Sequence, residues 1–214
     1  DGLHNYINYY IFKIKIIMKL SILILTLPSR RKTFLNDLLD SLEPQVAQHD
    51  NVELLVLYDN KKRSVGEKRD SIMSIANGEY TVFIDDDDVV TDDYVSSIIS
   101  CINENVGTDC VVFDTICTID DGIPIHCKYG VEYEYNNNAS GKGFWTGKPA
   151  HTMVYSKQLV LEASFGKSNI GEDMFWVRQV HGKIKNQSRV DKVLYYYKMN
   201  NTTTETRRWL KELK

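Results

Sequence analysis

The sequence lacks the features that mark a membrane-spanning or disulfide-stapled protein. Its four cysteines show no CxxC spacing, so we expect reduced, structural thiols and no disulfide framework. The apolar stretch at residues 16–27 is interrupted by Lys19 and is too short to cross a bilayer. The net charge is only −3, which gives no overall attraction to nucleic acid or to an acidic membrane surface. These absences favour a soluble, cytoplasmic globular protein.

The length and the composition fit one ordinary domain. The chain has 214 residues, of which 43% are apolar and 26% charged, typical of a soluble protein with a real core. Residues 1–17 have no starting methionine, while Met18 stands directly before the first convincing strand. We therefore expect residues 1–17 to be a leader or tag-like extension and residues 18–214 to form a single domain.

The first half alternates apolar runs of strand length with segments of helical periodicity. Strands are expected at residues 20–27, 52–57 and 80–84. Between and after them, apolar residues recur at helical spacing in residues 34–42, 72–76 and 94–102, and Pro44 is expected to end the first helix. This order predicts an α/β fold whose mostly parallel central sheet carries helices on both faces, with residues 18–104 typical of a nucleotide-binding half.

The second half, residues 105–214, changes character. Shorter strands are expected at residues 109–119, 123–127, 131–135, 151–155 and 192–198, which predicts a smaller antiparallel part. A short helix is expected at residues 171–181 and a basic one after residue 206. The polar, glycine-bearing segment 136–147 is either a mobile surface connection or a loop in which Phe144 and Trp145 form an apolar platform for a substrate.

Four consecutive carboxylates, residues 85–88, end the third predicted strand. Adjacent acids repel one another, so a fold that places them at the tip of a core strand normally supplies a counter-cation. Oxygen ligands favour Mg²⁺, Mn²⁺ or Ca²⁺, and ligands of α/β sheets bind at the carboxyl ends of the strands. The alternative is a solvated acidic loop that also caps the next helix.

Polar residues follow the other two strands as well. Arg30 follows the first strand and Asp59 the second, with Lys68 and Arg69 nearby in the chain. If the sheet is parallel, all of them lie at one edge. Cations and a divalent metal there would neutralise phosphate oxygens, and a carboxylate would accept a hydrogen bond from a base or ribose, which suits a nucleoside diphosphate. The alternative for the basic segment 61–69 is a solvated face.

An ordered series of motifs resembles a known family. A PSR turn follows the first strand, an aspartate follows the second, and GEKR leads into ANGEY and VFIDDDD; GED and an aromatic helix with Arg178 come later. Together they resemble the family 2 inverting glycosyltransferases of the GT-A fold, from about residue 18 to residue 206. The resemblance implies a Rossmann-like single domain in which residues 18–104 bind a nucleotide-sugar and residues 105–214 bind the acceptor.

The resemblance also implies roles for single residues. Asp85 and Asp87 match the DxD motif, with Asp87 as the principal metal ligand and Asp85 on the metal or the ribose; the register Asp86–Asp88 is the rival assignment. Asp173 matches the general base that deprotonates the acceptor hydroxyl. Glu172 and Asp173 are alternatively first-turn acids favoured by the helix dipole. The residues implied for the nucleotide-sugar are Pro28, Arg30, Asp59, Arg69, Asp85, Asp86 and Lys198, and those for the sugar or acceptor side are Trp145, His151 and Glu172.

The implied function is a metal-dependent, inverting transfer of a sugar from a nucleotide-sugar, UDP-linked, to an acceptor hydroxyl of a glycan. Mn²⁺ or Mg²⁺ would stabilise the departing diphosphate, and no protein nucleophile is needed. Many relatives supply a late histidine as a further metal ligand, which YYYKMNNTTT lacks, leaving Lys198, Asn200 or Thr202 as candidates. A nucleotidyltransferase is disfavoured because no G-x-G-T-R loop follows the first strand. A non-catalytic nucleotide-sugar-binding protein, and a transferase acting on a modified nucleic-acid base, stay open as alternatives.

Overall fold

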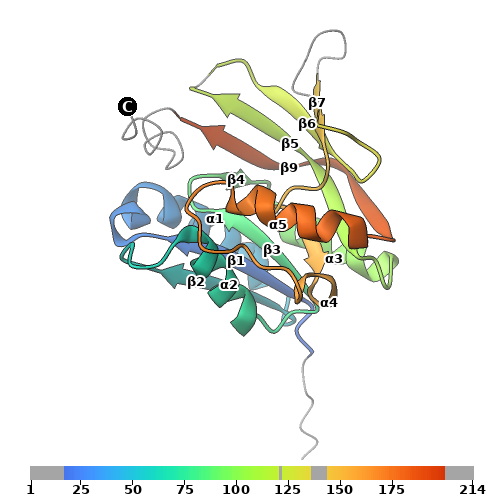
Figure 1. Ribbon diagram of the computed structural model, residues 1–214, viewed down its shortest axis with the longest axis horizontal. Helices are drawn as coiled ribbons and strands as arrows, with labels where there is room; N and C mark the ends of the chain where they lie inside the picture. The colour runs from blue at the N-terminus through green and yellow to red at the C-terminus, as the bar shows by residue number, and fades with distance from the viewer. Residues whose placement is uncertain (1–16, 121, 136–143, 201–214) are drawn as a thin grey trace, which may run out of the picture.

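The computed structural model describes residues 17–120, 122–135 and 144–200, which form one mixed α/β domain around a twisted sheet (Figure 1). The strands are β1 (Leu20–Thr26), β2 (Val52–Tyr58), β3 (Tyr80–Asp85), β4 (Val89–Val90), β5 (Cys110–Ile119), β6 (Ile125–Tyr129), β7 (Phe144–Gly147), β8 (Val154–Ser156) and β9 (Gln187–Met199). The helices are α1 (Asn36–Val46), α2 (Val65–Ile75), α3 (Tyr94–Glu104), α4 (Lys157–Val160) and α5 (Glu172–Val180), with short irregular turns at Pro28–Arg30, Arg31–Leu35 and His181–Lys183.

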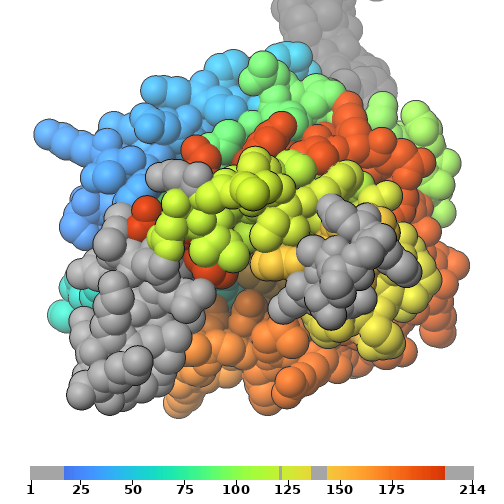
Figure 2. All heavy atoms as spheres, turned by 90° about the horizontal axis from the view of Figure 1, so that it is seen from above, coloured from blue at the N-terminus to red at the C-terminus, as the bar shows by residue number. Residues whose placement is uncertain are grey.

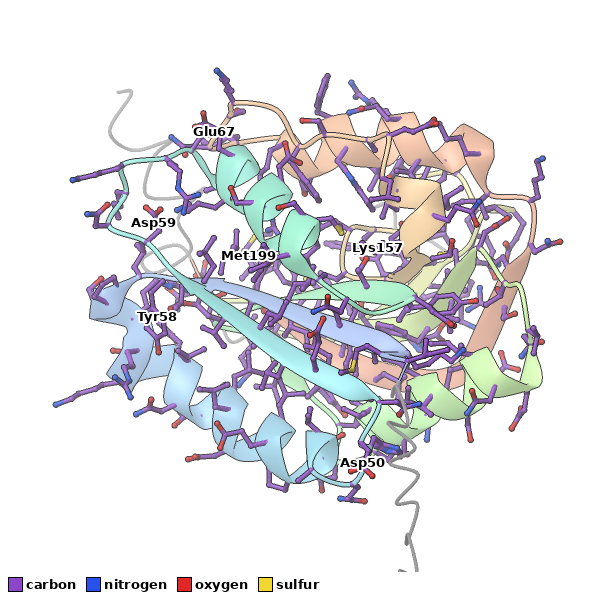
Figure 3. All side chains as sticks on the ribbon, turned by 90° about the horizontal axis from the view of Figure 1, so that it is seen from below. Asp50, Tyr58, Asp59, Glu67, Lys157 and Met199 are labelled. Atoms are coloured by element: carbon purple, nitrogen blue, oxygen red, sulfur yellow. The ribbon has the colours of Figure 1, made fainter. Side chains whose placement is uncertain are left out.

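The first half is the predicted parallel sheet. The central strand β1 pairs with β2 from Leu20–Val52 to Thr26–Tyr58, and with β3 from Leu20–Tyr80 to Leu25–Asp85. All three carboxyl ends therefore meet at one edge. Figure 3 shows Asp50, which precedes β2, and Asp59, which follows it, at opposite ends of the sheet. The carboxylates after β3 thus lie at the same edge as Asp59.

The second half extends this sheet with strands of mixed direction. The short β8 pairs antiparallel with both β3 and β5, and β6 pairs antiparallel with β5. The long β9 returns parallel to β5, with irregular register around Asp114, and its far half also pairs with β4. Seen from above, the segment that holds β6 lies between the N-terminal elements and the α5 segment (Figure 2). The predicted fold class is confirmed.

Helices cover both faces of the parallel strands (Figures 1 and 3), with α1 and α3 on one face and α2 and α5 on the other. Because β1 and β3 are covered on both sides, they are continuous apolar runs rather than alternating ones. A row of aromatic rings ties α5 to the sheet: Phe83 meets Phe165 edge to face, Phe165 stacks on Trp176, and Trp176 meets Tyr155 edge to face. All four cysteines lie in the described residues as buried free thiols.

Several predicted elements need correction. Residues 131–135 alternate like a strand but form a turn, in which the Tyr133 N–H donates to the carbonyl of Gly130. Phe144–Gly147 is strand β7, beside β6, although we predicted a loop. Pro44 does not end α1: it lies in the last turn and removes only its own N–H, and the Ala47 N–H beyond it still donates to the Glu43 carbonyl. Residues 1–16 of the predicted extension 1–17, and the predicted basic terminal helix, lie outside the described residues.

Glu53 at the start of β2 anchors the turn before β3 and supports a prediction of pH dependence. Its carboxylate accepts hydrogen bonds from Ser21 Oγ at 2.5 Å and from the Asn77 backbone and side chain at 2.5 and 3.1 Å. Burial acts to raise the pKa of Glu53, but these hydrogen bonds outweigh it and the pKa is lowered. The stabilisation is therefore present above the unfolded pKa of about 4.3 and is lost as the pH falls through the lower folded value.

We expect Glu53→Gln to lower the free energy of unfolding at pH 7 by about 1–2 kcal/mol, since hydrogen bonds to a charged acceptor are lost or weakened. The difference from the wild type should shrink as the pH falls below about 4. Urea denaturation at a series of pH values measures this. Glu43→Gln, on the exposed surface of α1, is the matched control, with an expected effect below about 0.5 kcal/mol. Equal pH profiles for the two variants would contradict the role of Glu53.

Candidate active site

A cavity of about 690 Å³ opens at the carboxyl edge of β1 and β3. Its wall combines residues from these strand ends and α2 with residues from β5, β9 and the start of α5. The polar and aromatic residues that line it include Thr26, Arg30, Lys61, Arg63, Lys68, Arg69, Asp85, Asp86, Asp87, Thr115, Tyr129, His151, Thr152, Asn169, Glu172, Asp173, Tyr195 and Tyr197. The first and second halves of the chain therefore share one site.

Arg30 binds the two middle members of the acid cluster, the four consecutive aspartates at residues 85–88. Its guanidinium contacts Asp86 through Nε at 3.0 Å and NH2 at 2.7 Å, and NH2 also lies 2.9 Å from Asp87 Oδ2. Asp86 is buried and accepts a further hydrogen bond from Thr26 Oγ1 at 2.7 Å. The turn after β1 thus provides a fixed positive charge for two of the four aspartates.

Arg69 of α2 neutralises the first aspartate and joins it to α5. Its NH2 donates to Asp85 Oδ1 at 3.0 Å, and its Nε lies 3.5 Å from Glu172 Oε1. The guanidinium also lies over the ring of Phe83, 4.9 Å from the centroid. Both Arg69 and Glu172 are buried, so each charge depends on the other for compensation.

Asp88 points away from the cavity and binds β9. Its Oδ2 accepts from the Tyr195 hydroxyl at 2.6 Å and its Oδ1 from the Lys198 backbone N–H at 2.9 Å. The same tyrosine hydroxyl accepts from the Asp85 N–H at 3.2 Å. The last aspartate thereby fixes the end of β9 against the loop that carries the other three.

The four carboxyl groups differ in their electrostatic environment. Burial acts to raise the pKa of Asp85, but the charge and hydrogen bond of Arg69, together with the nearby His151 imidazole, outweigh it and lower the pKa. Burial raises the pKa of Asp87, helped by the charges of Asp85 and Asp86 and opposed by Arg30. Burial and the Asp85 charge raise the pKa of Asp88. Repulsion from neighbouring carboxylates thus adds to burial in raising the pKa of the last two members of the cluster.

Basic side chains before and within α2 supply positive charge to another part of the cavity wall. Lys61, Arg63 and Lys68 all line the cavity. Arg63 Nε also donates to Asp59 Oδ2 at 3.1 Å. Burial acts to raise the pKa of Asp59, but the Arg63 hydrogen bond and the charges of Lys68 and Arg63 outweigh it and lower the pKa. This carboxylate is ionised beside the basic wall and lies behind it, because Asp59 itself does not line the cavity.

Asp173 enters the cavity from the first turn of α5. Its side chain is 37% exposed, and its Oδ1 accepts from the Met174 N–H at 2.7 Å. The segment before it is docked onto α2, where Gly66 N–H donates to the Ser168 carbonyl at 2.9 Å. A Cβ on Gly66 would lie 2.2 Å from the Gly166 carbonyl oxygen, so this backbone approach requires glycine. Contacts between α2 and residues 164–170 thus set the position of Asp173.

The structure brings together most of the residues that the sequence singled out. The cavity is lined by Arg30, Arg69, Asp85, Asp86, Asp87, His151, Glu172 and Asp173. Four others are not among its lining residues: Pro28, Asp59, Trp145 and Lys198. Pro28 lies exposed beside Arg30, Trp145 lies on β7, and the Lys198 side chain lines a separate small hollow with Val89 and Tyr196. For all twelve residues the predicted roles stay predictions.

Two tyrosines of β9 line the cavity although sequence reasoning missed them. In the run Tyr195–Tyr197, alternation along the strand buries Tyr195, exposes Tyr196 and half-buries Tyr197. The alternation of strand side chains was the available signal. This signal could not be used on three consecutive tyrosines, because the sequence alone does not say which of them point inward.

The donor set fits a divalent cation that takes part of its coordination from a ligand. Within residues 17–120, 122–135 and 144–200, no three histidine, cysteine or acidic side chains are grouped so as to hold a metal by themselves. Asp85 and Asp87 nevertheless present carboxylate oxygens to the cavity. Mg²⁺ is typically bound by one or two carboxylates together with substrate phosphates and water. These two residues fit that pattern.

Comparison with known proteins identifies related sequences and folds. The sequence model described as "Glycosyl transferase family 2" matches residues 45–165, more than half of the chain. No curated protein sequence matches this chain.

No helix in the described residues is long and apolar enough to cross a membrane.

Two solved structures represent the structural relatives. S. aureus TarS 1–349 in complex with UDP-GlcNAc superposes with a TM-score of 0.61 at 16% identity, covering 85% of this chain and 58% of that one. Glucosyl-3-phosphoglycerate synthase from Mycobacterium tuberculosis, in complex with Mn²⁺, UDP-glucose and phosphoglyceric acid, gives 0.54 at 15% identity, covering 83% and 71%. This chain therefore spans about three fifths of the TarS structure. The likeness confirms the predicted fold, a GT-A type α/β domain.

Proposed function

The chain belongs to glycosyl transferase family 2. On that premise, we propose that it transfers a sugar from a UDP-linked donor to an acceptor hydroxyl of a glycan. One observation carries the proposal. A single cavity holds basic side chains and the acid cluster, contributed by the first half of the chain, together with Asp173 from the second half. The donor binds the half formed by residues 18–104 and the acceptor the half formed by residues 105–214.

The cations of the cavity wall suit the diphosphate of the donor. Lys61, Arg63 and Lys68 line one continuous cavity with Arg30. Charge-assisted hydrogen bonds from such groups bind phosphate oxygens strongly. TarS and the mycobacterial synthase have been solved with UDP-GlcNAc and UDP-glucose, which supports a uridine nucleotide here. Asp59, ionised just behind this wall, would recognise the base, with Pro28 and Arg30 beside it.

Asp85 and Asp87 would hold Mn²⁺ or Mg²⁺. The rival pair is less suitable, because Asp88 does not line the cavity and is held by Tyr195 and the Lys198 backbone, whereas Asp85 and Asp87 both line it. A cation at this position would relieve the repulsion among neighbouring carboxylates that helps to raise the pKa of Asp87 and Asp88. When bound, such a cation supplies positive charge that stabilises the departing diphosphate. The mycobacterial synthase, solved with Mn²⁺ and UDP-glucose, supports the choice of such a cation.

Asp173 acts as the general base. Its carboxylate takes the proton of the acceptor hydroxyl while that oxygen forms a bond to the anomeric carbon. The bond from that carbon to the diphosphate breaks at the same time, and UDP leaves from the opposite face. A single displacement of this kind inverts the configuration and needs no protein nucleophile. Arg30 and the basic wall bind the leaving group, and Glu172 stays paired with Arg69.

Calorimetric titration with UDP, with and without Mn²⁺, tests the donor site. We expect the wild type to bind UDP and Mn²⁺ to strengthen the binding at least tenfold. Asp87→Ala should abolish this strengthening, because one of the two carboxylates is lost. Asp92→Ala removes an exposed carboxylate outside the cavity and is the matched control, with affinity expected within about twofold of the wild type. A folded wild type that binds no nucleoside diphosphate would overturn the proposal.

A further inference from the structure

His151 lies between the acid cluster at one side of the cavity and Asp173 at the other. Its Nε2 is 3.6 Å from Asp85 Oδ2, and its Nδ1 is 3.8 Å from Asp173 Oδ2. Nε2 is buried and has no hydrogen-bond partner within the described residues. One imidazole thus faces both the first aspartate of the acid cluster and the carboxylate proposed as the base. The side chain is 13% exposed, so few solvent contacts compete with these two.

The backbone around His151 is fixed from the inner side. The buried Tyr155 hydroxyl lies within hydrogen-bond distance of the carbonyls of Pro149 and Ala150, at 3.0 and 2.9 Å. His181 Nε2 lies 2.8 Å from the Pro149 carbonyl oxygen. The ring of Tyr155 also packs against Trp176 at 5.0 Å. Because Trp176 belongs to α5, the helix that carries Asp173, these contacts hold the turn of His151 and the base in one rigid unit.

The distances suit contacts that tighten when substrates bind. Hydrogen bonds within an active site are often long in the absence of ligand and shorten in the reactive complex. Asp173 Oδ1 is held by the Met174 N–H, so Oδ2 is the oxygen that a side-chain donor can orient. Nδ1 of His151 lies 3.8 Å from it and can serve as that donor in the tautomer that carries the ring proton on Nδ1. Each carboxylate oxygen then accepts from one protein donor and keeps a lone pair free for the acceptor hydroxyl.

We propose that His151 is a positioning residue: Nδ1 donates to Asp173 Oδ2 and orients the base, and the ring lies beside Asp85 on the donor side. This inference rests on the proposed function. It accounts for a buried imidazole between two carboxylates of different elements. It also gives a physical link between the donor half and the acceptor half of the site.

The test compares three substitutions at position 151. Asn places an amide N–H near the position of Nδ1, Gln places its amide near Nε2, and Phe removes both nitrogens while keeping the ring. UDP binding is measured by calorimetry and thermal unfolding by circular dichroism. Turnover is measured as UDP release from UDP-GlcNAc or UDP-glucose, with water or methyl glycosides as acceptor. The double variant His151→Phe/Asp173→Asn is compared with Asp173→Asn alone.

We expect His151→Phe and His151→Gln to lower kcat about a hundredfold with donor KM and UDP affinity within threefold of the wild type. His151→Asn should retain at least a tenth of the wild-type kcat. In the Asp173→Asn background, His151→Phe should add less than a twofold loss, because the two residues act as one unit. The inference is overturned if the folded Phe variant keeps wild-type kcat, if Asn is no better than Phe, or if the two losses multiply. If the wild type binds no UDP, the proposed function itself is overturned. If the wild type binds UDP and turns over, any of those three results overturns only the role of His151.

Discussion

Asp173→Asn is expected to lower kcat for sugar transfer by about a thousandfold, within the range of about 10²–10⁴ for a general base. The amide keeps the shape of the carboxylate, and its oxygen can still accept from the Met174 N–H at the start of α5. What it loses is the ability to take a proton from the acceptor hydroxyl. UDP affinity should stay within about twofold, since Asp173 belongs to the acceptor side. Release of UDP from a UDP-sugar measures turnover, and calorimetry measures binding.

Two comparisons sharpen this result. Asp191→Asn makes the same chemical change on an 89% exposed side chain of β9 and should leave turnover unaltered. Glu172→Gln tests the neighbouring acid, which is buried against Arg69 and is expected to affect stability more than proton transfer. Wild-type turnover in Asp173→Asn together with its loss in Glu172→Gln would assign the base to Glu172 and contradict our proposal.

The parallel half of the fold could be predicted because its sequence pattern has few competing interpretations. Strands β1 and β3 are buried on both faces, and a continuous apolar run of strand length between helical segments has few other solutions. Parallel pairing then brings the three carboxyl ends to one edge. The parallel topology alone therefore predicts that Arg30 lies near the aspartates.

The second half was harder because its strands are defined by partners rather than by their own sequence. Residues 131–135 alternate well but have no strand pairing, whereas Phe144–Gly147 is short and glycine-bearing yet pairs with β6. The strand β9 begins at Gln187, five residues before the predicted start, because parallel pairing with β5 recruits its polar first residues. Such tertiary selection overrides local propensity.

The sequence also does not predict which side chains pair with one another across the site. We predicted that Arg69 faces the nucleotide, and it does line the cavity. Its partners Asp85 and Glu172, which lie 16 and 103 positions further along the chain, were not predicted. His151 stood out only as a lone histidine, and its place between Asp85 and Asp173 depends on how β8 and α5 pack. Composition and spacing identify charged residues, but which charge compensates which is decided by packing.

Arg69→Met is expected to lower the free energy of unfolding by about 3–5 kcal/mol, the usual result of removing one partner from a buried charge pair. The arginine is 6% exposed and neutralises Asp85 and Glu172 together, so its loss leaves two carboxylates without their compensating charge. The lost contact with the Phe83 ring adds to the effect. Arg69→Lys keeps the charge but not the planar fork, and we expect an intermediate loss. Urea denaturation at pH 7 measures all three proteins.

The charge mechanism predicts two further results for Arg69→Met. Adding Glu172→Gln removes one of the uncompensated carboxylates and should restore at least about 1 kcal/mol, a non-additive result expected of contacting residues. The charge of Arg69 acts to lower the folded pKa of Asp85, which stabilises the wild type above the unfolded pKa of about 3.9 and not below the folded value. The difference between wild type and variant should therefore narrow as the pH falls through this range. Arg31→Met, an exposed control in the turn before α1, should cost less than about 0.5 kcal/mol. A loss in Arg69→Met that is independent of pH and unrelieved by Glu172→Gln would mean that packing against Phe83, rather than charge compensation, is the main contribution of Arg69.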